Sequence, residues 1–275
     1  MRHTAKVVSV LYRACWAAFF GQLAASFFFD FPALWGWLLI AAAIALGLVA
    51  NRLARPAGDP GPAVEVEPPV DGRWSALNSP ADKVPSHGTH GYGQTFAIDI
   101  VADPEDRPRP TPGWTPLVRR NRDFPAFGSP VFAAADATVV HAEDHRRDHL
   151  GRSSWPALLY LFAESLVRET GGPGHLVGNH VVLDLGDGVF ALYAHLERGS
   201  VTVRAGDRVR AGGPLARCGN SGNSSEPHVH FQLMDGPDLR TARGIPFRWR
   251  GVGVPANGEH FTVAAVRGPG GAPGG

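Results

Sequence analysis

Residues 180–195, HVVLDLGDGVFALYAH, indicate two β-strands joined by a tight turn. Apolar side chains dominate both arms, and the Gly-Asp-Gly between them is a strong turn signal. Further short strands are expected at 95–101, at 130–140 (two strands around a turn), at 200–203 and at 214–218. Short strands separated by turn residues predict a mainly β domain whose antiparallel sheet folds on itself.

One segment departs from this β pattern. Residues 156–169, PALLYLFAESLVRE, have apolar side chains at helical spacing, with Pro156 in the first turn. Gly171 and Gly172 follow the segment and end it. We therefore expect one inserted helix beside the sheet, within an insertion that spans about 144–177.

Composition limits the classes of function. The chain of 275 residues has a net charge of +1 with scattered basic residues, so we expect no nucleic-acid partner. The 34 Gly and 24 Pro favour a loop-rich, strand-based domain. The 2 cysteines, Cys15 and Cys218, are far apart in sequence, which argues against a disulfide framework or a cysteine zinc site. A metal site in this chain must use histidine and carboxylate ligands.

The first fifty residues differ from the rest of the chain. Residues 7–29 and 33–50 are apolar, and each segment approaches the roughly 20 residues that cross a bilayer as a helix. Arg13 lies inside the first segment, which weakens the prediction of a first span. A signal peptide is the alternative interpretation of that segment. Either way we expect a membrane anchor of one or two transmembrane helices.

The charges around these segments leave the orientation open. Arg2 and Lys6 flank the first segment, and Arg52 and Arg55 follow the second. By the positive-inside rule a two-span hairpin would leave the main domain in the cytoplasm, whereas a single span would place it outside.

The remaining boundaries follow composition. A Pro- and Gly-rich linker with little to bury precedes the domain, and a low-complexity Gly/Pro run ends the chain. The predicted order is a membrane anchor, a linker, a β domain with its helical insertion, and a C-terminal extension with a disordered tail, over residues 1–54, 55–73, 74–250 and 251–275.

The histidines indicate a metal site. His228 and His230 are two residues apart on one expected strand, so their side chains point to the same face. His230 is the first candidate zinc ligand. Asp99 is the second, because a carboxylate inside an apolar strand is costly without a cation. A catalytic zinc needs a third protein ligand, and the upstream loop SHGTH, residues 86–90, is expected to supply it.

These motifs resemble a known family. Asp99, YAHL at 193–196 and HVHF at 228–231 occur in the order seen in the lysostaphin-type, or LytM-type, zinc metalloendopeptidases of peptidoglycan. The resemblance extends over about residues 80–233, with supporting segments at 128–142, 178–188 and 206–233. It implies the LytM-like fold of the duplicated hybrid motif type and a Zn²⁺ cofactor. No HExxH or GxSxG motif is present to indicate another peptidase class.

The resemblance also implies roles for individual residues. Asp99 and His230 would bind the metal, and His195 and His228 would lie beside it as catalytic groups. The family usually places its first histidine four residues before the aspartate, where this chain has Thr95. This chain resembles instead a branch in which PSHGT is followed by GQxxAID, which implies that a histidine of that longer loop reaches the metal. We favour His87 as the third ligand, with His90 as the alternative.

The sequence therefore predicts a membrane-anchored zinc endopeptidase that hydrolyses the peptide cross-bridges of bacterial peptidoglycan. Such a substrate places the domain outside the cytoplasmic membrane, against the charge pattern of a two-span hairpin. The alternative, based on Thr95, is an inactive LytM-like module that binds or regulates cell-wall hydrolases.

Overall fold

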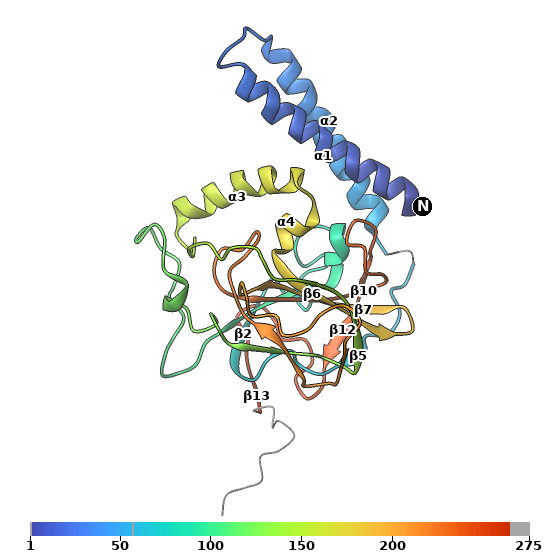
Figure 1. Cartoon of the computed structure of the whole chain (residues 1–275), viewed down its shortest axis with the longest axis vertical. Helices are drawn as coiled ribbons and strands as arrows, with labels where there is room; N and C mark the ends of the chain where they lie inside the picture. Colours follow the sequence, from blue (N-terminus) through green and yellow to red (C-terminus); the bar gives the residue numbers. More distant parts are fainter. Residues whose placement is uncertain (1, 57, 265–275) are drawn as a thin grey trace, which may run out of the picture.

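The computed structural model of the chain describes residues 2–56 and 58–264. Figure 1 shows a β domain with a helical hairpin extending from one end of it. The hairpin consists of α1 (Arg2–Ala25) and α2 (Ala33–Ala54), which pack against each other. Both helices are long and apolar enough to be candidate membrane spans, as the sequence predicts.

The domain is built on one antiparallel sheet, which confirms the predicted fold class. Its 9 strands follow the order β13-β2-β3-β10-β7-β6-β5-β8, with β11 paired to β10. These strands are β2 (Gly72–Leu77), β3 (Ile98–Ala102), β5 (Ala137–Glu143), β6 (Asn179–Gly186), β7 (Val189–Leu196), β8 (Arg208–Val209), β10 (Val229–Met234), β11 (Gly244–Ile245) and β13 (His260–Val263). Two small sheets complete the domain, namely β1 (Val64–Val66) with β12 (Phe247–Trp249), and β4 (Pro130–Phe132) with β9 (Pro214–Arg217).

The quoted hairpin of β6 and β7 lies at the centre of this sheet and has a core on each face. Successive side chains of a strand point to opposite faces. Leu183 and Tyr193 accordingly join the larger hydrophobic cluster, which also contains Phe231 of the neighbouring β10. Leu192 and Ala194 join a smaller cluster on the opposite face. The central strands are therefore buried on both sides, and the smaller cluster marks the face that carries the site described below.

The expected linker is partly structured. The sequence predicts little to bury over 55–73, but β1 pairs in parallel with β12, and Val66 and Val70 are buried in the larger cluster. In the expected extension 251–275, β13 pairs with β2. These strands are only three and four residues long, too short to give a clear period. The run at 268–275 lies outside the described residues.

Two further expectations need correction. The strand predicted at 95–101 begins only at Ile98, because residues 91–96 form the 3₁₀ segment η1 (Gly91–Phe96), in which Tyr92 and Gly93 have positive φ. Residues 200–203 are not a strand, although the backbone N–H of Thr202 donates to the Leu215 carbonyl. A second short 3₁₀ turn is η2 (Asn121–Asp123).

The predicted helix is present as α3 (Trp155–Thr170). The Ser154 side chain caps it by accepting from the Ala157 N–H at 3.3 Å, and Pro156 lies in its first turn. The short helix α4 (Pro173–Val177) follows and leads into β6. In Figure 1, α3 lies at the end of the domain from which the hairpin extends, and it contacts α1.

Candidate metal centre

Asp99 and His230 face each other across neighbouring strands. They are direct partners in the register of β3 and β10, and both side chains are buried. His230 Nδ1 lies 2.8 Å from Asp99 Oδ1. Their strand neighbours Ile98, Ile100, Val229 and Phe231 all point into the larger cluster. Strand alternation therefore directs the carboxylate and the imidazole to the opposite, solvent-reaching face.

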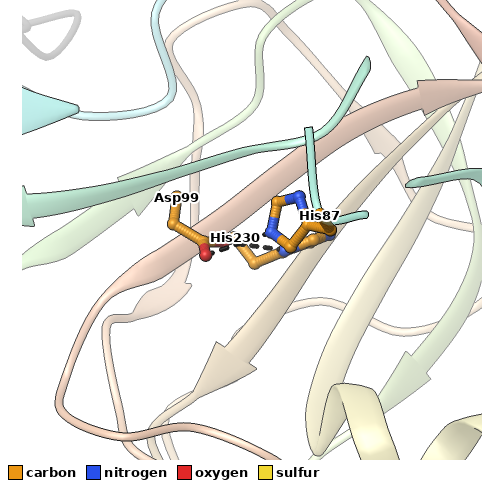
Figure 2. A group of neighbouring side chains, drawn as sticks. All are labelled: His87, Asp99 and His230. Carbon is orange, nitrogen blue, oxygen red and sulfur yellow. Dashed lines mark hydrogen bonds and ion pairs between the residues drawn. The ribbon is translucent and has the colours of Figure 1, made fainter. Parts of the chain in front are cut away.

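His87 comes from the loop before η1 and completes the group. Its Nε2 lies 3.1 Å from Asp99 Oδ2, and Figure 2 shows the His87 and His230 rings beside the Asp99 carboxylate. The loop is held where the Ser86 N–H donates to the Thr95 carbonyl and Gly88 adopts a φ of 72°. Ligand atoms of the three residues lie within 4.8 Å of one another.

His90, the alternative third ligand, points elsewhere. Its Nδ1 lies 3.0 Å from Thr95 Oγ1. Thr95 is buried in η1 and is not on a strand beside Asp99. The structure thus places His87, and not His90, in contact with the Asp99 carboxylate, and Thr95 holds the loop that carries both histidines.

The Asp99 carboxylate has a further partner that the sequence did not indicate. Asn78 Nδ2 donates to Asp99 Oδ2 at 2.8 Å. Burial alone would raise the pKa of the Asp99 carboxyl. The neighbouring His87 and His228, together with the hydrogen bond to His230, hold that pKa well below its usual value. The lowered pKa favours the negatively charged form of Asp99, and that charge attracts cations to the site.

His195 and His228 lie beside this group. Their ring centroids are 4.6 Å apart, and His228 Nε2 lies 3.6 Å from Asp99 Oδ1. His195 Nδ1 donates to the Ser221 carbonyl at 2.9 Å, and His228 Nδ1 donates to the Glu226 carbonyl at 2.8 Å. Both bonds place the proton on Nδ1 of the neutral ring and leave the Nε2 lone pair available.

His195 owes its position to a backbone irregularity. Its φ is 61°, which is uncommon for a residue other than glycine. Regular alternation after Ala194 would turn His195 toward the larger cluster. The positive φ instead brings its ring next to His228 and leaves Leu196 in the larger cluster. Burial, with the adjacent rings of His228 and His230, holds the pKa of His195 well below its usual value.

Gln232 orients His230 and was missed at the level of sequence. His230 Nε2 donates to Gln232 Oε1 at 2.9 Å, and Gln232 Nε2 donates to the Tyr92 carbonyl at 2.8 Å. The Tyr92 carbonyl only accepts, so it fixes which end of the amide faces His230. The lone pair of neutral His230 then lies on Nδ1, the atom that faces Asp99. The two-residue spacing from His230 along the strand was the available signal.

The donor set fits a zinc ion. Two imidazoles and one carboxylate are three ligands of types that zinc prefers, and a catalytic zinc site has three protein ligands with one open position. Within the described residues, the buried Asp99 forms ion pairs with histidines and with no arginine or lysine. A cation between His87, Asp99 and His230 would compensate this buried charge.

These side chains line a cavity of about 600 Å³. The helical hairpin and α3 form part of its wall, through residues that include Ser9, Tyr12, Asn51 and Leu161. Asn51 Oδ1 of α2 accepts from Thr89 Oγ1 at 3.0 Å and from the backbone N–H of His90. The end of the second helix therefore contacts the loop that carries His87.

A second histidine group lies outside this cavity. His141, Glu143 and His180 offer ligand atoms within 4.8 Å of one another on β5 and β6. His180 Nδ1 donates to the Gly178 carbonyl at 2.8 Å, and burial lowers its pKa to about 4. Glu143 also pairs with Arg146.

Comparison with known proteins agrees with the motifs. Residues 160–241 match Peptidase family M23, and they include His195, His228 and His230, whereas His87 and Asp99 precede the match. The glycyl-glycine endopeptidase ALE-1 of Staphylococcus capitis is 38% identical over 73 residues. That stretch is 26% of this chain and 20% of the relative, so the chain spans about a fifth of the length of the curated relative it matches.

Solved structures show weaker similarity. The catalytic domain of the prophage-encoded M23 protein EnpA of Enterococcus faecalis is 19% identical, with a TM-score of 0.33, over 71% of this chain and 95% of that one. The catalytic domain of lysostaphin of Staphylococcus simulans is 20% identical, with a TM-score of 0.32, over 67% and 86%. On the family match and the relative, the resemblance to lysostaphin-type peptidases is confirmed, and residues 160–241 are the part of the chain that is similar to peptidase family M23.

Proposed function

We propose that this protein is a zinc-dependent endopeptidase that hydrolyses peptide cross-bridges of bacterial peptidoglycan. The observation that carries the proposal is the convergence of His87, Asp99 and His230, with the His195 and His228 rings beside them. The family match supports a peptidase, and the similarity to a staphylococcal glycyl-glycine endopeptidase supports cleavage within a peptide chain.

His87 Nε2, the Asp99 carboxylate and His230 Nδ1 would hold the zinc ion. When bound there, zinc would supply Lewis-acid chemistry, polarising the scissile carbonyl and activating a water molecule. Asp99 supplies the negative charge of the ligand set, and Gln232 keeps the donor atom of His230 directed at the site. The chain thus provides three ligands and leaves one position open to substrate.

His195 and His228 would move protons and stabilise charge. The lowered pKa of His195 keeps its ring neutral at neutral pH, so its Nε2 can accept a proton from the attacking water. A protonated ring can then donate to the developing oxyanion of the substrate and to the leaving amine. The short separation of the two rings lets them serve the two ends of one scissile bond.

The two apolar helices would anchor the enzyme in the cytoplasmic membrane, with its domain on the outer side where the wall lies. The exposure of large apolar side chains such as Phe28, Leu34 and Leu48 supports the membrane anchor, and the wall substrate is the reason for the outer side. Protease added outside spheroplasts should digest the domain. Complete protection, with digestion only after lysis, would place the domain in the cytoplasm.

Activity is tested with the zinc-loaded full chain in detergent and with purified sacculi. Walls with glycine-containing bridges and walls with direct cross-links are compared by mass spectrometry of the released fragments. We expect soluble fragments with new amino termini from at least one wall type, and none from the His228→Ala variant. A chain that binds zinc and releases nothing from any wall would favour the inactive regulatory module.

A further inference from the structure

The outward face of α3 is apolar and exposed. Trp155, Leu159 and Phe162 recur at spacings of four and three residues, and their exposed fractions are 51%, 75% and 68%; Val167, five residues after Phe162, is exposed at 51%. Side chains at such spacing share one face of a helix. The charged residues of α3 are engaged elsewhere, with Glu164 bound to Arg152 and Arg168, and Glu169 bound to Tyr92. The outward stripe therefore contains no charged side chain.

A neighbouring loop extends this apolar surface. Trp114, Leu117, Val118 and Leu150 are also exposed, at 72%, 58%, 45% and 50%. Ser154 Oγ donates to the Leu117 carbonyl at 2.7 Å, which ties the loop to the start of α3. A cavity of about 690 Å³ lies between them, lined by residues that include Leu117, Val118, Leu150 and Tyr160. Exposed apolar side chains that gather around one cavity favour a binding surface on a folded protein.

The location of the surface indicates what covers it. α1 contacts α3, and both helices line the same wall of the catalytic cavity. The first half of α1 packs on the domain as far as Arg13, whose guanidinium lies against Gly172. Beyond Arg13, α1 rises only about 18 Å, against about 30 Å of hydrocarbon in a bilayer. A bilayer that covers the hairpin would therefore reach the level of α3 (Figure 1).

The charged residues at the edge of this surface also fit contact with a lipid bilayer. Arg120 and Arg147 are exposed, the first next to the 114–118 loop and the second in the lining of the apolar cavity. Tryptophan and tyrosine are enriched where a protein meets the boundary of headgroups and acyl chains. Arginines beside an apolar helix face attract anionic headgroups. The apolar stripe, the aromatic rings and the basic residues at the edge together match the composition of a helix that lies in a membrane interface.

We propose that the docking surface, defined as the outward face of α3 with the 114–118 loop and Leu150, lies in the interface of an anionic lipid bilayer. The proposal rests on the membrane anchoring proposed above. The catalytic cavity, which lies between the hairpin, α3 and the sheet, is then held at the membrane surface. The enzyme would reach the peptide bridges closest to the membrane.

The test uses the full chain in vesicles of phosphatidylglycerol and phosphatidylethanolamine. In a background with Cys15→Ser and Cys218→Ala, one environment-sensitive fluorophore is attached at Phe162→Cys, Ile44→Cys or Thr262→Cys. Ile44 is an exposed residue of α2, and Thr262 is an exposed residue of β13, at the opposite end of the domain from α3. We expect lipid-borne quenchers to quench the labels at positions 162 and 44, and to leave the label at position 262 unchanged.

The outcomes separate the two proposals. Quenching at position 44 without quenching at position 162 would overturn docking and keep the anchor. Absence of quenching at both positions would overturn the anchor and docking together. A label at position 162 that is shielded from water but not quenched by lipid would mean that another protein, or a second copy of this chain, covers the face.

A charge variant gives an independent check. Leu159→Glu with Phe162→Glu places two carboxylates on the exposed stripe, at the two most exposed apolar positions of α3. Quenching of a label at Val167→Cys should then fall to the level seen at position 262. Undiminished quenching at position 167 would overturn the docking surface.

Discussion

Replacing Gln232 with leucine should weaken zinc binding by about 10- to 100-fold, the usual effect of losing a partner that orients a ligand. That loss corresponds to about 1.4 to 2.8 kcal/mol. Gln232 is fully buried, accepts from His230 Nε2 at 2.9 Å and donates to the Tyr92 carbonyl at 2.8 Å. Leucine fills a similar volume but accepts no hydrogen bond from His230 Nε2. The tautomer of His230 with its lone pair on Nδ1 is therefore no longer favoured.

The same change also lowers stability, and a second variant separates the two effects. Leucine leaves two buried polar groups unpaired, each at a cost of about 1 to 3 kcal/mol. Gln232→Glu keeps an acceptor for His230 but places a carboxylate oxygen against the Tyr92 carbonyl. We therefore expect the glutamate variant to lose stability while it retains zinc affinity, whereas the leucine variant loses both.

The assay is competition for zinc with a fluorescent chelator, run beside guanidinium unfolding of the metal-free protein in detergent. Gln94→Leu is the matched control, because Gln94 lines the same cavity and its side chain makes no hydrogen bond to His87, Asp99 or His230. A leucine variant at position 232 that is folded and binds zinc within twofold of the unchanged chain would refute this role for Gln232. So would equal affinity loss in the leucine and glutamate variants.

Three more outcomes are expected. His195→Ala and His228→Ala should each cut fragment release from sacculi by at least about 100-fold with zinc content unchanged by mass spectrometry; loss of zinc would contradict their catalytic role. Asn51→Ala removes the acceptor for Thr89 and His90, so hydrogen exchange over 86–91 should speed up and zinc affinity fall by about fivefold, or about 1 kcal/mol; unchanged exchange would count against this contact. His180 has a pKa lowered to about 4 by burial, so the folded state favours its neutral form. This preference contributes roughly 3 kcal/mol to the free energy of unfolding. The contribution is fully present above the pKa of histidine in the unfolded chain, about 6.5, and it is lost as the pH falls toward 4. Guanidinium midpoints at pH 7.5 and 4.5 should differ less for His180→Gln than for the unchanged chain, and equal differences would oppose this explanation.

Strand periodicity carried much of what the sequence could predict. The two-residue spacing of His228 and His230 placed both on one face, and the cost of a carboxylate in an apolar strand singled out Asp99. The hairpin at 180–195 and the helix at 156–169 are present as predicted. All of these features depend on residues close together in the chain, for which alternation and helical spacing are direct signals.

Long-range contacts determined the rest. The sequence left His87 and His90 open, because their loop is placed by bonds to Asn51 and Thr95 that no local pattern reveals. The His195 ring lies next to His228 because of a positive φ, which strand alternation cannot predict. Likewise, nothing in the spacing of apolar residues indicated that the hairpin would form a wall of the cavity lined by His87, Asp99 and His230.

The central claim is that His87, Asp99 and His230 hold one zinc ion, and the zinc content of three full-length proteins tests it most directly. The unchanged chain, His87→Ala and His90→Ala are dialysed against the same buffered zinc and measured by mass spectrometry beside protein concentration. We predict about one zinc per chain for the unchanged protein and for His90→Ala, and far less for His87→Ala. Full zinc content in His87→Ala, or its loss in His90→Ala, would contradict the proposed ligand set.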